Sequence, residues 1–151
     1  MKVVADTDII STFARIKRLD ILKKLFDDVV ITNSVKQELV KGKIDVRSLN
    51  LSLLRLTREE LKELRKVHPA LDKGERECFV IARNRNLPLA SNEKIVSLLC
   101  EKEGMGYFTL PRILRFAILE GVITRQEATN IVELVEREEN TKIKNKKEIF
   151  K

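Results

Sequence analysis

The chain has 151 residues, 43% hydrophobic and 35% charged, which is the composition of one soluble globular domain and excludes a chain that is disordered as a whole. Its formal net charge of +7 favours a polyanionic partner such as a nucleic acid. No apolar run is long enough to cross a bilayer and the N-terminus has no signal-peptide core, so we expect a cytoplasmic protein without membrane contact.

Short apolar runs alternate with helical patterns along the chain. Four runs predict buried strands, at residues 2–5, 29–32, 87–91 and 106–109, and residues 49–56 form a weaker strand candidate. Amphipathic patterns predict helices at about residues 8–18, 19–28, 35–41, 57–68, 72–86, 93–103, 111–120 and 125–139. This alternation predicts an α/β fold, in which helices cover both faces of a parallel sheet.

Capping boxes mark several of the predicted helix starts. In this pattern the side chain of the first residue accepts a hydrogen bond from the backbone N–H three residues later. The side chain of that later residue in turn accepts one from the backbone N–H of the first residue. The pairs are Ser34–Gln37, Thr57–Glu60, Asp72–Glu75 and Thr124–Glu127. They fix where the helices begin more sharply than the apolar pattern does.

The end of the chain differs in composition from the rest. Residues 141–151 hold five lysines and one glutamate. Such a run is usually solvated and frayed. We therefore expect one domain over residues 1–140, followed by a basic, flexible tail over residues 141–151.

Histidine and cysteine usage argues against several kinds of site. The only histidine, His68, precedes Pro69 in a predicted loop, which disfavours histidine catalysis and zinc binding. Cys78 and Cys100 lie in apolar helical patterns without metal-type spacing, so we interpret both as reduced core residues. A site in this protein is expected to use oxygen ligands.

Two acids interrupt the apolar stretch "VVADTDII" at residues 3–10. Asp6 follows the first predicted strand, and Asp8 stands two positions later. On this stretch alone the acids are explained as the end of a strand and the cap of a helix. However, sites in parallel sheets form beyond the carboxyl ends of the strands. The third strand ends at "SNE" (residues 91–93), so Asp6 and Glu93 are expected on one rim.

Further acids lie in the first turns of predicted helices. Glu38 follows Val35 by three residues, which places it near the buried stripe of its helix. Glu77 is flanked on its helix by apolar residues and has no capping role. Glu75 is different, because it completes a capping box and needs no further explanation.

Asp6, Glu38, Glu77 and Glu93 together suggest a metal centre. Clustered carboxylates stay ionised only if a cation offsets their mutual repulsion. With oxygen ligands alone, the fitting ions are Mg²⁺ and Mn²⁺. Such a centre activates water and neutralises the charge that develops on a phosphodiester. In a basic protein this combination indicates a nuclease.

Four segments resemble the PIN-domain family, and the similarity is greatest to its prokaryotic VapC-like type. They are "VVADTDIISTFARI", "VVITNSVKQEL", "DKGERECFVIARNRNLPLASNEKIVSLL" and "GYFTLPRILRFAILEGVIT". The resemblance covers nearly all of the chain except the lysine-rich tail. It implies a three-layer α/β/α fold with a mostly parallel sheet and metal-dependent ribonuclease activity. It also implies frequent homodimers and often a cognate antitoxin protein.

The resemblance assigns roles to the first three acids. Asp6 resembles the first acid of the family, and Asp8 stands where Asn or Ser is commoner. Glu38 resembles the second acid. Glu77 resembles the third acid because a small residue follows it, with Glu75 as the second choice.

The fourth acid departs from the family pattern at "LASNEK". An aspartate is usual there, in the order Thr-x-Asp or Asp-Asp. If Ser91 takes the threonine position, Glu93 is the fourth acid. If Asn92 takes the acid position, one negative charge is lost. We favour Glu93 because Ser-Asn-Glu parallels Thr-Asn-Asp.

Our leading hypothesis is therefore an endoribonuclease that uses Mg²⁺ or Mn²⁺ and cleaves RNA, with a toxin of a toxin–antitoxin pair as one biological setting. The alternative is a PIN-fold module that binds nucleic acid or protein and has a weakened site. A third reading is a DNA nuclease of flap type. Metal-dependent cleavage of RNA and of single-stranded DNA distinguishes these hypotheses.

Overall fold

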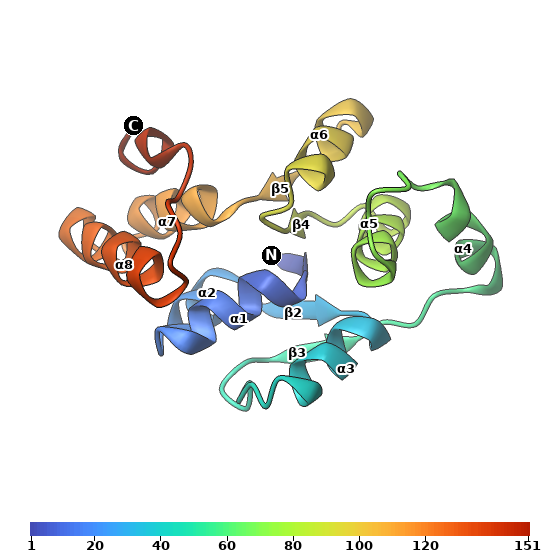
Figure 1. The fold of residues 1–151 in the computed structure, drawn as a ribbon, viewed down its shortest axis with the longest axis horizontal. Coiled ribbons are helices and arrows are strands. Elements are labelled where there is room, and N and C mark those ends of the chain that lie inside the picture. The colour runs from blue at the N-terminus through green and yellow to red at the C-terminus, as the bar shows by residue number, and fades with distance from the viewer.

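The computed structural model describes residues 1–151, which form a parallel sheet of five strands flanked by eight α-helices (Figure 1). The strands are β1 (Lys2–Ala5), β2 (Asp28–Ile31), β3 (Leu51–Leu53), β4 (Leu89–Ala90) and β5 (Tyr107–Phe108). Their order across the sheet is β3-β2-β1-β4-β5, and every neighbouring pair is parallel. The predicted α/β/α architecture is confirmed, and the weak candidate at residues 49–56 supplies β3.

The helices follow the predicted order. They are α1 (Thr7–Arg15), α2 (Leu19–Leu25), α3 (Asn33–Lys41), α4 (Arg58–Glu63), α5 (Lys73–Arg85), α6 (Lys94–Glu103), α7 (Leu110–Leu119) and α8 (Arg125–Glu138), with 3₁₀ helices η1 (Leu64–Lys66) and η2 (Lys146–Phe150). None of the helices combines the length and the apolar character that crossing a membrane requires.

Three of the four predicted capping boxes are confirmed, at the starts of α4, α5 and α8. The box predicted at Ser34 and Gln37 is wrong. Thr32 caps α3 instead, because its extended backbone follows β2 directly and its side chain accepts the N–H of Val35. Ser34 therefore lies inside the first turn, where its own N–H is free to bond elsewhere.

The central strand β1 is buried on both faces. Val3, Val4 and Ala5 are each at most 2% exposed, as expected for a strand in the middle of a covered parallel sheet. Cys78 and Cys100 are buried free thiols within this core, which agrees with the sequence interpretation. A rigid, dry strand thus leads directly to Asp6.

The sheet has a topological switch point between β1 and β4. From β1 the chain adds β2 and β3 on one side and later adds β4 and β5 on the other. Crevices for ligands form at such points, beyond the carboxyl ends of the two strands. The backbone N–H of Asp6 donates to the carbonyl of Ala90 at 3.0 Å, which aligns the two strand ends. The acids predicted after these strands therefore meet at the same edge.

Part of the basic C-terminal segment, residues 141–151, packs on the domain, contrary to the expected flexible tail. Residues 146–150 form η2, which lies against α7 near the C-terminus (Figure 1). Ile149 is 1% exposed, and Arg125 donates to the carbonyl of Phe150 while its guanidinium lies 5.2 Å from that ring. The apolar residues between the lysines give this segment a buried side, which a count of its charged residues does not predict.

The packed tail predicts that Ile149→Ala lowers the free energy of unfolding by about 2 to 5 kcal/mol, because the substitution leaves a cavity. Urea denaturation measures the change. Leu119→Ala on α7 is the control, since Leu119 is 65% exposed and its loss should matter little. Equal, small effects from both substitutions would show that the tail is detached.

Candidate functional site

Asp6 ends β1 and begins α1, so it has a structural role as well as a position at the switch point. Its Oδ1 accepts the N–H of Thr7 at 2.8 Å and caps the helix. Its Oδ2 accepts a hydrogen bond from Ser91 Oγ at 3.4 Å. Asp6 is only 7% exposed. The cap belongs to Asp6, and Asp8 lies in the first turn of α1.

The Asp6 carboxyl group holds its proton more tightly than an ordinary aspartate. Its pKa is raised to about 7, first because the group is buried and then because Asp8 carries a like charge nearby. The hydrogen bond from Thr7 opposes this shift, and Glu75 and Asp72 add to it. Burial and crowding of like charges are the two conditions that a bound cation relieves.

Further acids lie with Asp6 at the carboxyl ends of β1 and β4, and we call this edge of the sheet the acidic rim. The pKa of Asp8 is raised, first by desolvation, although the residue as a whole is exposed, and then by the charges of Glu93 and Glu139. The pKa of Glu75 is raised by desolvation and by the charges of Asp72, Glu93 and Asp8. Glu75 therefore fills its capping box and also faces the rim. Segments far apart in the sequence bring these charges together.

The structure distinguishes Asn92 from Glu93 by what each side chain already does. Asn92 Oδ1 accepts the N–H of Leu110 at 2.8 Å, at the start of α7. The backbone N–H of Glu93 donates to Ser91 Oγ at 3.1 Å, while its carboxylate caps nothing. The free carboxylate near Asp8 and Glu75 favours Glu93 as the fourth acid.

Glu77 and Glu38 lie between α3 and α5. Glu77 is 5% exposed, and its Oε1 accepts the N–H of Ser34 at 3.3 Å, which joins the two helices. Glu38 is exposed, so the prediction that it lies near the buried stripe is wrong: α3 buries Val35 and Leu39 instead.

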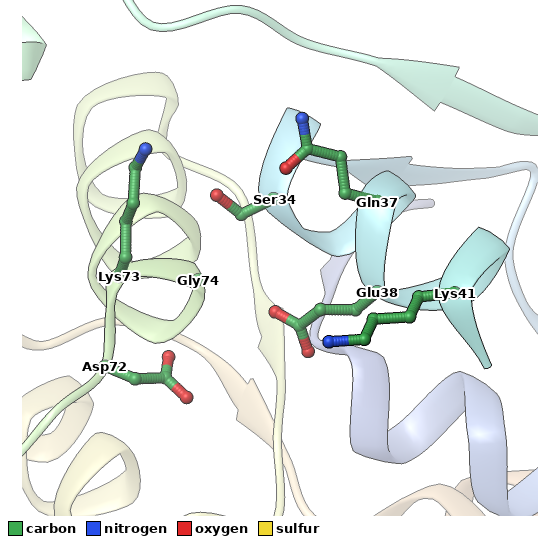
Figure 2. Close-up of a pocket in the computed structure, with 7 residues that line it drawn as sticks. All are labelled: Ser34, Gln37, Glu38, Lys41, Asp72, Lys73 and Gly74. Carbon is green, nitrogen blue, oxygen red and sulfur yellow. The ribbon is translucent and has the colours of Figure 1, made fainter.

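Figure 2 shows Glu38 reaching from α3 toward the start of α5. It lines an open cleft of about 360 Å³ that contains no hydrophobic residue. The lining residues are Ser34, Gln37, Glu38, Lys41, Asp72, Lys73 and Gly74. The cleft thus combines two carboxylates with two lysines between α3 and the N-terminal end of α5.

The donor set fits a hard, partly hydrated cation. No three acids, cysteines or histidines lie at metal-ligand spacing. Mg²⁺, however, usually keeps several waters and needs only one or two direct carboxylates. The oxygen donors, the raised pKa of Asp6 and the buried Thr7 Oγ1, which has no hydrogen-bond partner, all suit such an ion. The residues present therefore fit Mg²⁺ or Mn²⁺ better than a softer metal.

Two charges at the rim were not proposed as site residues from the sequence. Asp72 was interpreted only as a helix cap, which it also is. Glu139 follows α8 and carries no motif; Thr12 Oγ1 donates to its Oε1 at 2.7 Å and holds it near α1. The capping pattern could have pointed to Asp72, whereas only the tertiary fold places Glu139.

Fold and rim together define an α/β/α protein with a carboxylate-lined edge at its switch point. A family model described as "PIN domain" matches residues 2–146, so the chain belongs to the PIN-domain family, whose members are generally nucleases. This confirms the resemblance seen in the sequence. A comparison with curated protein sequences gives no match.

A solved structure shares the fold. It is a PilT N-terminus domain protein from the hyperthermophilic archaeon Sulfolobus solfataricus P2, with a TM-score of 0.57 and 18% sequence identity. The similarity covers 75% of this chain and 90% of that chain. At this identity the likeness establishes the architecture, and the site must be argued from the residues themselves.

The raised pKa predicts how the metal-free protein responds to pH. Folded Asp6 keeps its proton up to about pH 7, whereas the ordinary value is 3.8, so stability falls as pH rises through this interval. Asp6→Asn removes the buried charge. In EDTA the variant should melt above the parent at pH 8, with little difference at pH 4.

Asp20→Asn is the control of opposite sign, because Arg18 lowers the pKa of Asp20 and the carboxylate stabilises the fold above that pKa. It should melt slightly below the parent at pH 8. If the difference in melting temperature between Asp6→Asn and the parent is the same at every pH, the Asp6 carboxylate is not an uncompensated buried charge.

Proposed function

We propose that this protein is a metal-dependent endoribonuclease that hydrolyses RNA phosphodiester bonds. The observation that carries the proposal is the buried Asp6 carboxyl at the switch point, with a pKa of about 7 and like charges beside it. The proposed metal-binding and catalytic residues are Asp6, Glu38, Glu77 and Glu93, with Asp8, Glu75 and Asn92 as secondary candidates.

Asp6 and Glu93 have distinct tasks in this proposal. When bound, Mg²⁺ or Mn²⁺ lowers the pKa of water and offsets charge on the phosphate. Asp6 is the rigid donor, since β1 and its bonds to Thr7 and Ser91 fix its position. Glu93 brings a second carboxylate from the start of α6. The two carboxylates would hold the cation at the edge of the sheet, where it can offset the charge of a bound phosphodiester.

The basic character of the chain supports a nucleic-acid substrate. Lys41 and Lys73 line the cleft beside Glu38, and neither has an acidic partner within ion-pair distance (Figure 2). Free lysines bind phosphates and release counterions. The choice of RNA over DNA, a homodimer and a small antitoxin partner are proposed on the family resemblance alone. A cytoplasmic location stays an expectation from the sequence.

A binding module without catalysis is the second candidate. It is favoured by one observation, namely that no three acids lie at metal-ligand spacing. In that case the lysines and the net charge of +7 would act without cleavage. Binding of RNA that needs no divalent ion, with no metal-dependent cleavage, would identify this function.

The nuclease proposal predicts that Asp6→Asn and Glu93→Gln each lower cleavage of a single-stranded RNA about 100-fold or more in Mn²⁺, because each removes charge that holds the cation. Gel assays of a labelled RNA, with parallel single-stranded DNA, measure the rates. Circular dichroism should show an intact fold in both variants.

Asp45→Asn is the control, because it alters an exposed acid that pairs only with Arg47, and it should cleave like the parent. Asn92→Ala tests the secondary candidate: with Glu93 as the fourth acid, it should cleave nearly normally but melt lower, since it loses the bond to Leu110. Cleavage at the parental rate by Asp6→Asn would refute the site.

A further inference from the structure

Gly74 occupies a position where the backbone does not require glycine. It is the second residue of α5, after the cap Asp72, and its φ lies outside the positive region. Glycine is less favourable than alanine inside a helix. Gly74 is also buried, so a methyl group there would normally add packing. Another constraint must account for its place.

The space beside Gly74 is taken by the Glu38 carboxylate. A Cβ at this position would lie 2.8 Å from Glu38 Oε1, which is closer than side chains approach. The next neighbours, Asp72 Oδ1 at 3.6 Å and Ser34 Cβ at 3.8 Å, would be ordinary contacts. The only obstacle to a side chain at Gly74 is therefore the acid of α3.

No hydrogen bond or ion pair holds the Glu38 side chain, in contrast to Glu77, which accepts the N–H of Ser34. The open space beside Gly74 admits the Glu38 carboxylate next to the first turn of α5, where the N–H groups favour a negative charge. Figure 2 shows this carboxylate facing the start of α5, on the side of Asp72 and Gly74.

We propose that Gly74 is a positioning residue: its missing side chain forms a notch in the first turn of α5 that receives the Glu38 carboxylate and holds it at the acidic rim. This inference rests on the proposed metal-dependent function. Because the obstructed atom is the end of a flexible side chain, Gly74→Ala should displace Glu38 without disturbing the fold.

Mn²⁺ binding by calorimetry tests the notch with four proteins: the parent, Gly74→Ala, Glu38→Asp and the double variant. Gly74→Ala should weaken Mn²⁺ binding about tenfold or more, the range seen when a ligand loses its support. Its melting temperature in EDTA should equal or exceed that of the parent. Glu38→Asp alone should also weaken binding, because the shorter side chain does not reach the notch.

The double variant gives the decisive result. The aspartate at position 38 ends one methylene earlier and does not reach the notch, so the added methyl of Gly74→Ala has no carboxylate to displace. Gly74→Ala should therefore weaken Mn²⁺ binding in the parent and cause no further loss in the Glu38→Asp background. Gly106→Ala is the matched control, since a Cβ there meets only Pro88 at 3.6 Å and should leave binding unchanged.

Each other outcome overturns the proposal. Parental Mn²⁺ affinity in Gly74→Ala, or a further loss of affinity from Gly74→Ala in the Glu38→Asp background, would show that Gly74 does not position Glu38. Mn²⁺ binding by Asp6→Asn distinguishes failure of the notch from failure of the proposed metal site. If Asp6→Asn loses Mn²⁺ binding while Gly74→Ala does not, the notch alone is wrong; if both bind like the parent, the metal site is wrong as well.

Discussion

The burial of the Asp6 carboxyl group is the constraint around which this edge of the sheet is arranged. An apolar strand delivers the group to a position that is 7% exposed, where ionisation is unfavourable. The hydrogen bonds from the Thr7 N–H and the Ser91 hydroxyl offset the cost of ionisation only in part. The pKa of Asp6 therefore stays raised, at about 7. The charges of Asp8, Glu75 and Asp72 make ionisation of this group still less favourable, although Asp72 and Glu75 also cap α5. The proposed cation would offset that cost.

The topology explains why these acids meet. Parallel strands place their carboxyl ends on one edge, and the switch point separates the loop after β1 from the loop after β4. A helix begins shortly after several of these strands, so helix-capping residues and candidate metal ligands lie at the same edge of the sheet. Asp6 and Glu75 each take part in a helix cap and lie at the acidic edge, so a capping role does not exclude the proposed role in the site. The hydrogen bond from the Ser34 N–H to Glu77 then joins α3 to α5.

Local patterns in the sequence predicted most of the fold and part of the site. The capping boxes at Thr57, Asp72 and Thr124 are complete within four residues, so they could be read without tertiary information. The start of α3 was misplaced because Thr32 and Ser34 are equally good caps until β2 sets the backbone at Thr32.

Features that depend on packing between distant segments escaped the sequence. The lysine-rich end was expected to be solvated, yet Ile149 is buried against the domain. The exposure of Glu38 follows from how α3 rotates onto the sheet, and the place of Glu139 follows from where α8 ends. Asp6 was found because its signal is local: an acid directly after a buried strand.

The most direct test of a cation at this rim is anomalous diffraction at the manganese edge from crystals soaked in Mn²⁺. The account predicts a peak within ligand or water-bridged distance of the Asp6 carboxylate, with Glu93 and the acids of α3 and α5 around it, and no peak there in crystals of Asp6→Asn. A well-ordered crystal without a peak at Asp6, or with a peak only at a distant surface acid, would contradict the central claim.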